Sequence, residues 1–139
     1  MGETKAKRRK TPIAGLNRAI KELDRVLVNG KPTSTFYARH LVALYVKLHT
    51  SVYGVEPVEL HTGSCYFGAT SAATKLVRSE FGDDMNRVLA FIRWVWQRER
   101  ETEKWRRVNG AEGRRIGWHI MFAQRTLVTD YRLSKERSR

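Results

Sequence analysis

Residues 84–108 form the stretch that decides the fold: DMNRVLAFIRWVWQRERETEKWRRV. Its apolar side chains recur at the spacing of one face of an α-helix, and they are Met85, Val88, Leu89, Ile92, Val95 and Trp96. Gly82 followed by Asp83-Asp84 is typical of a helix boundary, because a helix N-terminus favours negative charge. We therefore predict a long helix whose first half lies in a core. Its second half, where the same face becomes polar, should project beyond that core or pack against a partner.

Four further segments show the helical period. The predicted helices cover residues 13–28, 35–53, 69–81 and 118–133. Asn29-Gly30 and Gly54 supply left-handed stops after the first two. Around Pro57 the helical pattern fails, and a weak alternation of apolar residues leaves room for a short extended segment near 55–62. The prediction is an all-α fold, a single compact bundle of about five helices.

Length and composition set the domain organisation. A chain of 139 residues with 41% apolar residues can close one hydrophobic core and leaves little room for a second. We expect a basic flexible tail over 1–12, a single helical domain over 13–133 and a basic C-terminal tail over 134–139. The sequence shows no signal peptide and no apolar run long enough to span a bilayer, and its single cysteine, Cys65, needs no oxidising compartment. We expect a cytoplasmic protein with no membrane partner.

The charge of the chain indicates what it binds. Lys and Arg number 27 against 14 Asp and Glu, which gives a formal net charge of +13. Such an excess repels itself in a folded domain and favours a polyanionic or acidic partner. The first ten residues hold a cluster of cations that would reach phosphates from a mobile arm, and its members include Lys7, Arg8, Arg9 and Lys10.

Two further basic groups lie in and after the long helix. At about 100° per residue, four cations share a narrow sector that we place well away from the core stripe: Arg93, Arg100, Lys104 and Arg107. A glycine-rich joint over 109–113 is followed by Arg114 and Arg115. The basic helix end, the joint and a new helix start near Trp118 could together cradle a phosphate. The alternative is an ordinary solvated connector.

The tryptophans of this region allow two interpretations. Trp94 and Trp105 share a second sector of the helix with Arg98, and Trp118 follows the joint. Indoles at such positions can stack on bases or anchor a protein partner. Since a tryptophan is more often largely buried, Trp94 and Trp105 could instead pack under the last or the first helix.

The sequence gives no support for catalysis. The four histidines and Cys65 show no paired metal-ligand spacing, and the glycines do not form a phosphate-binding loop. Asp83 and Asp84, with Glu80 nearby, could be imagined as the metal ligands of a nuclease, but their position fits a helix N-terminus better. We therefore expect no enzyme activity, no metal and no cofactor.

Two functions of different kinds remain. We expect first a non-enzymatic accessory subunit that binds DNA or RNA through backbone contacts and aromatic stacking, without strong sequence specificity. The alternative is a regulator or assembly adaptor that docks on a protein complex acting on nucleic acid, such as a polymerase, helicase or effector complex. A compact basic chain of this style suggests the accessory proteins of phages and mobile elements, although no motif identifies a family.

Overall fold

The computed structural model is all-α, as the sequence predicts. The helices are α1 (Gly2–Val26), α2 (Ala38–Tyr53), α3 (Gly63–Phe81), α4 (Met85–Asn109) and α5 (Thr126–Arg137). Two short antiparallel strands, β1 (Leu27–Val28) and β2 (Lys31–Pro32), follow α1, and single turns, η1 (Val58–His61) and η2 (His119–Ala123), precede α3 and α5. The structure describes the backbone of residues 2–61 and 63–137 and the side chains of 14–60 and 65–137.

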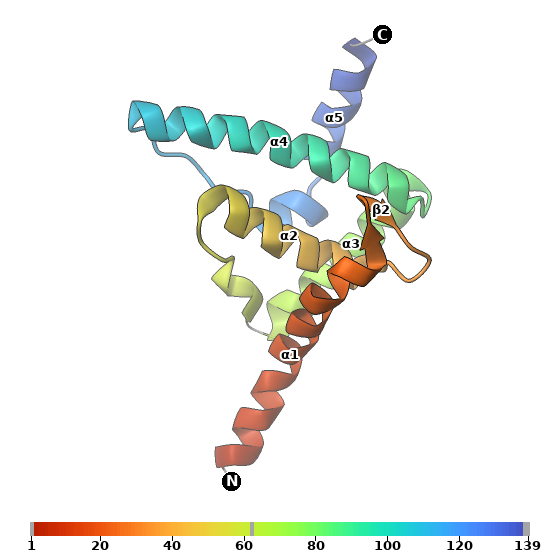
Figure 1. The fold of residues 1–139 in the computed structure, drawn as a ribbon, viewed down its shortest axis with the longest axis vertical. Helices are drawn as coiled ribbons and strands as arrows, with labels where there is room; N and C mark the ends of the chain where they lie inside the picture. The colour runs from red at the N-terminus through yellow and green to blue at the C-terminus, as the bar shows by residue number, and fades with distance from the viewer. Residues whose placement is uncertain (1, 62, 138–139) are drawn as a thin grey trace.

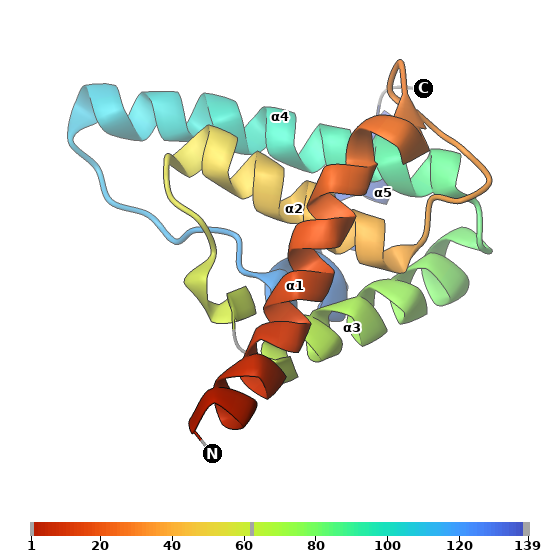
Figure 2. The same cartoon turned by 60° about the horizontal axis from the view of Figure 1, so that its bottom comes forward.

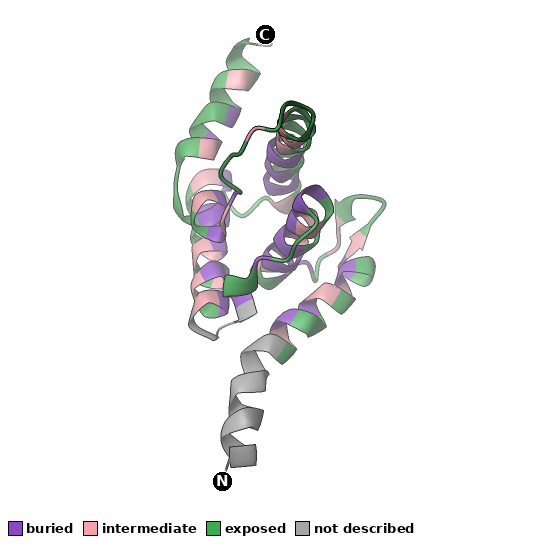
Figure 3. Ribbon diagram, turned by 90° about the vertical axis from the view of Figure 1, so that its left-hand side faces the viewer, coloured by how far each residue is buried: buried purple, intermediate pink, exposed green. Residues whose placement is uncertain are grey.

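Helix α2 lies at the centre of the bundle. It runs beside α4, is crossed by α1 and packs on α3 from its other side (Figures 1 and 2). Most of the residues of α2 are therefore buried. Figure 3 shows the buried residues on the helix faces that meet at the centre. Helix α5 packs against α4 and then projects away from the bundle (Figure 1).

The loop after α1 is a hairpin. Asn29 and Gly30 both adopt a positive φ, at 53° and 76°. Two successive left-handed residues are what a tight hairpin turn requires, so this dipeptide does more than end α1. By contrast, the extended segment considered near 55–62 is wrong. That stretch forms the 3-10 turn η1, in which Leu60 is buried and its N–H bonds to the carbonyl of Pro57 at 3.1 Å.

Helix α3 begins at Gly63, earlier than the predicted residue 69. The predicted helix starts after Gly68 because a glycine inside a helix usually destabilises it. Here Gly68 lies inside the helix, at a point where the indole of Trp118 packs so closely that a larger residue would be crowded. A Cβ atom on Gly68 would lie 3.2 Å from Cη2 of that ring. A close approach of two elements explains a glycine that looks like a helix breaker.

The last predicted helix, over 118–133, is broken in two. Trp118 leads into a single π-helical turn, η2, and Gln124 is extended before α5 begins. Since η2 packs on α3 whereas α5 packs on α4, the chain changes direction between them. Helix α5 continues to Arg137, so residues 134–137 of the predicted C-terminal tail are helical. Helix α1 begins at Gly2 instead of the predicted residue 13, so the backbone of residues 2–12 of the predicted N-terminal tail is helical; their side chains lie outside the described part of the chain.

Two histidines of α2 are buried in the core. His40 is fully buried; its Nδ1 accepts the N–H of Tyr37 at 2.9 Å, and its Nε2 lies 3.4 Å from a carboxylate oxygen of Glu22. His49 is also buried, and its Nδ1 lies 2.7 Å from the carbonyl oxygen of Val55. Desolvation lowers the pKa of both imidazoles below the usual 6.5, and their hydrogen bonds oppose this shift only in part.

We expect the fold to lose stability as the pH falls below 6.5. Near that pH the unfolded chain takes up protons on His40 and His49, whereas the folded chain keeps them neutral, so protonation favours unfolding. Urea unfolding at about pH 7.5 and about pH 5.5 measures the difference. His49→Gln should reduce it, and His119→Gln, at an exposed position, should not. Equal stability of the natural chain at both pH values would contradict this expectation.

Candidate nucleic-acid interface

Helix α4 carries six of the thirteen predicted site residues, and its ends are capped. The side chain of Asp84 accepts hydrogen bonds from the N–H groups of Asn86 (3.0 Å) and Arg87 (3.4 Å), which satisfies two of the free amides of the first turn. At the other end, Gly110 is left-handed with φ 62°. Asp84 therefore caps the helix at the predicted boundary, and Gly110 ends it.

Helix α4 has a buried half and a free half. Its inner face is buried as far as Trp96, and Phe91 joins the predicted core residues. No residue of α4 beyond Trp96 is buried: Trp105 is 60% exposed and Val108 is 85% exposed. Figure 2 shows this end of α4 extending past the end of α2. We call residues 97–109 the free half of α4, and its projection beyond the core agrees with the sequence prediction.

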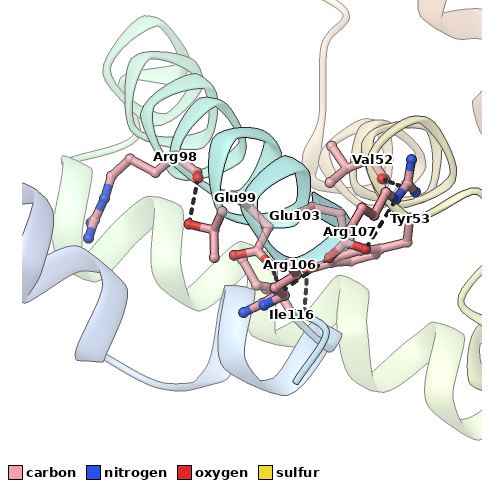
Figure 4. Close-up of polar contacts among 9 residues, drawn as sticks. Val52, Tyr53, Arg98, Glu99, Glu103, Arg106, Arg107 and Ile116 are labelled. Carbon is pink, nitrogen blue, oxygen red and sulfur yellow. Dashed lines mark hydrogen bonds and ion pairs between the residues drawn. The ribbon is translucent and has the colours of Figure 1, made fainter. Parts of the chain in front are cut away.

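Polar contacts connect the free half of α4 to the end of α2 (Figure 4). Glu99 accepts hydrogen bonds from the hydroxyl of Tyr53 and from Nη1 of Arg106, both at 2.9 Å. The same guanidinium nitrogen lies 3.3 Å from a carboxylate oxygen of Glu103. These side chains are all at most partly exposed, so the contacts are shielded from water more than ordinary surface ion pairs.

The connector after α4 is fixed, which corrects the prediction of a flexible joint. The N–H of Ile116 donates to the hydroxyl of Tyr53, and the carbonyl of Ile116 accepts the hydroxyl of Tyr45, both at 2.8 Å. A Cβ atom on Gly113 would clash with the guanidinium of Arg106, so this glycine allows a close approach of side chain to backbone. The amide of Ile116 is thus already bonded, and the helical segment that starts near Trp118 is only the single π-helical turn η2.

Arg114 and Arg115 lie exposed on this fixed connector. The guanidinium carbon of Arg115 is 5.8 Å from the ring centroid of Tyr53. Arg115 also lines a small cavity with Glu103 and Arg106, so it has a defined place next to the end of α4.

The four cations of the predicted sector, Arg93, Arg100, Lys104 and Arg107, form a basic ridge on α4. This ridge lies next to the core stripe, which corrects its predicted placement well away from that stripe. Its sector borders buried residues of α4 and faces α2 and the hairpin. Arg93 donates to the carbonyl oxygen of Gly30 in the hairpin turn. Arg107 donates to the carbonyl oxygen of Val52 at 3.2 Å, in the last turn of α2, where helix carbonyls lack intrahelical partners. The two ends of the ridge therefore stabilise the fold.

The middle of the ridge borders a groove. Arg100 and Lys104 line a cavity of about 550 Å³ between α2, α4 and the hairpin, and no described residue forms an ion pair with either cation. Its apolar lining includes Leu27, Leu44 and Leu48, all half-buried. Sequence reasoning did not find this groove, because its leucines and its cations lie on different elements.

The three candidate tryptophans have different surroundings. Trp94 is half-buried, with its ring centroid 5.3 Å from that of Tyr131 in α5 and the guanidinium carbon of Arg98 4.3 Å from its own. Packing under the last helix is therefore the correct interpretation for Trp94. Trp105 is mostly exposed, so the same interpretation is wrong for it. Trp118 is 8% exposed, and this burial in the core leaves it little ring surface for stacking.

Truncation of the two indoles of α4 should affect stability differently. Trp94→Ala removes a ring packed against Tyr131, so we expect the free energy of unfolding to fall by about 2 kcal/mol. Trp105→Ala removes a ring that lies mostly in water, and we expect a change within about 0.5 kcal/mol. Urea unfolding followed by circular dichroism measures both. Equal losses in the two variants would contradict the surroundings described for these rings.

The four predicted cations of the N-terminal segment, which are Lys7, Arg8, Arg9 and Lys10, lie outside the described side chains.

The described residues contain no group of three or more His, Cys, Asp or Glu side chains that could hold a metal ion. Among the same residues, no helix combines the length and apolar character that crossing a membrane requires. Comparisons with protein-family models, curated proteins and solved structures find no match to this chain.

Proposed function

We propose that this protein is a non-enzymatic accessory subunit that binds nucleic acid through phosphate contacts and aromatic stacking, without strong sequence specificity. The observation that carries the proposal is the free half of α4. It presents Arg100 and Lys104, which make no ion pair with described residues, and Trp105, which is 60% exposed. The net charge of +13 favours a polyanion as the partner.

The chemistry of these groups fits phosphates and bases. A cation that forms no ion pair can neutralise a phosphate and release the counterions bound there, which is the main source of non-specific affinity. Arg114 and Arg115 add two exposed cations beside the end of α4. An exposed indole can stack on an unpaired base of any type, a contact of about 1–3 kcal/mol. None of these contacts reads a base edge, so little sequence preference is expected.

A charge-matched pair of variants tests this interface. The first combines Arg100→Gln, Lys104→Gln and Trp105→Ala. The control combines Lys47→Gln, Arg87→Gln and Tyr37→Ala, which removes the same charge and an exposed ring elsewhere. Fluorescence anisotropy with labelled oligonucleotides of about 20 nucleotides should show about tenfold weaker binding and a salt slope lower by about two for the first variant. Equal losses in both variants would refute this interface while leaving general charge attraction intact.

The groove between α2 and α4 favours a second candidate function, that of a protein adaptor. Its leucine lining and cationic edge match a partner segment with apolar and acidic side chains. Leu48→Gln changes this lining without removing a cation. Copurification with and without nuclease separates the two functions, because partners held through nucleic acid leave on digestion. A protein that stays after nuclease treatment and is lost from Leu48→Gln would favour the adaptor.

A further inference from the structure

A second cavity, of about 760 Å³, lies between α3 and η2. On one side it is lined by α3, including Gly68, Ala72 and Lys75, and on the other by Trp118 and Phe122. No residue of α4 lines it, so it is separate from the interface proposed above. Its size falls within the usual range of small-molecule sites, about 300–1,000 Å³.

The shape of this cleft comes from small residues that face aromatic ones. Gly68 and Ala72 are four residues apart on α3 and therefore share a face of the helix. Opposite them, Trp118 and Phe122 are 8% and 3% exposed and form an apolar floor. Phe122 lies in the π-helical turn, a rare geometry that is frequently found at functional sites. The indole of Trp118 packs directly against Gly68, so the open part of the cleft lies beside Ala72, where a flat ring can rest against the apolar floor.

The charge of the cleft favours an anion. Among the described residues, Glu80 is the only acidic one that lines the cleft, and it is already paired with Arg125 (3.2 Å) and Arg132 (2.8 Å). Lys75 and Arg78 also line the cleft and form no ion pair with any described residue. Two uncompensated cations therefore remain on the α3 side, where they can bind a phosphate.

Polar groups without partners are also present. The hydroxyl of Ser71 and the side-chain amide of Gln124 line the cleft and make no hydrogen bond with described residues, whereas the hydroxyl of Ser79 already donates to the carbonyl of Lys75. Such groups can bond the heteroatoms of a polar ring.

We propose that this cleft binds a small organic anion that joins a flat ring to a phosphate, the chemistry of a nucleoside monophosphate. The ring lies in the slot between α3 and η2, and the phosphate lies at Lys75 and Arg78. The site goes beyond the proposed nucleic-acid interface and does not depend on it, because it shares no residue with the free half of α4.

Calorimetric titration with AMP, adenosine and inorganic phosphate tests the proposal. AMP should bind with one-to-one stoichiometry, and each half of the molecule should bind at least about tenfold more weakly, because the site recognises both parts. Lys75→Gln with Arg78→Gln should weaken AMP binding about tenfold, whereas the control pair Lys47→Gln with Arg87→Gln should leave it unchanged. Ala72→Leu should fill the slot and abolish binding.

Three results would overturn the site. They are no binding of AMP up to about 5 mM, equal affinity for inorganic phosphate and AMP, and AMP binding that the cleft variants leave unchanged. Thermal unfolding checks that Ala72→Leu folds, and Ser71→Leu, at an exposed position, fills the same cleft if it does not. Oligonucleotide binding by the cleft variants is measured in parallel. Its retention while AMP binding is lost would separate the two sites, and failure of the α4 interface would not alter the AMP result.

Discussion

Removal of residues 1–10 is expected to weaken nucleic-acid binding to a similar degree for every sequence tested. It should also lower the slope of log K against log salt by up to about five, because each cation that neutralises a phosphate contributes about 0.9 to that slope. The arm holds five cations, and they are Lys5, Lys7, Arg8, Arg9 and Lys10. The fold should survive, since Leu16, the first buried residue of α1 among the described side chains, lies outside the deletion.

A full-length variant with these five cations replaced by Gln separates charge from length. It should bind with the same reduced salt slope as the truncated chain, and both should unfold at the temperature of the natural protein. Unfolding of the truncated chain would make the segment structural. An unchanged salt slope in either variant would show that the charge of the arm serves another purpose.

Tyr53→Phe is expected to lower the free energy of unfolding by about 2–3 kcal/mol. The substitution keeps the ring but leaves the N–H of Ile116 without its acceptor and Glu99 without one of its donors. A buried donor left unsatisfied costs about 1–3 kcal/mol, and loss of a bond to a carboxylate adds to this. Burial raises the pKa of Tyr53, so this hydroxyl stays protonated and able to donate to Glu99.

Tyr131→Phe is the matched control for this variant. The ring of Tyr131 is also buried, but its hydroxyl makes no hydrogen bond with described residues, so its removal should change the free energy of unfolding by less than about 0.5 kcal/mol. Hydrogen exchange gives a second readout. In Tyr53→Phe the amide of Ile116 should exchange faster than in the natural chain. Equal stability of the two variants would mean that the connector does not depend on the hydrogen bond from Ile116 to the hydroxyl of Tyr53.

Helical periodicity predicted the parts of the fold that depend on neighbours along the chain. The core stripe of α4 was predicted because residues three and four apart share a helix face, and the cap at Asp84 because carboxylates satisfy first-turn amides. Phe91 was missed because it lies at the edge of that stripe. It is buried there by Tyr131, with ring centroids 5.4 Å apart, and only the tertiary fold brings α5 to that side.

The features that the sequence did not reveal all need partners far along the chain. The side chains at the two ends of the basic ridge, Arg93 and Arg107, turn toward the fold because they donate hydrogen bonds to the carbonyl oxygens of Gly30 and Val52. The connector looked flexible because of its glycines, and it is fixed by a hydroxyl of α2. Gly68 looked like a helix breaker because the approach of Trp118 cannot be read from local sequence. In each case a contact between residues far apart in the sequence determines which structure the local sequence pattern adopts.

The most direct test of nucleic-acid binding is an equilibrium titration of the intact chain at several salt concentrations. Labelled single- and double-stranded oligonucleotides of unrelated sequence should be used between about 50 and 200 mM salt. We predict that log K falls linearly with log salt, with a slope of about −4 or steeper, and that affinity depends little on sequence. Undetectable binding at the lowest salt, or an affinity that does not change as salt rises, would contradict this function.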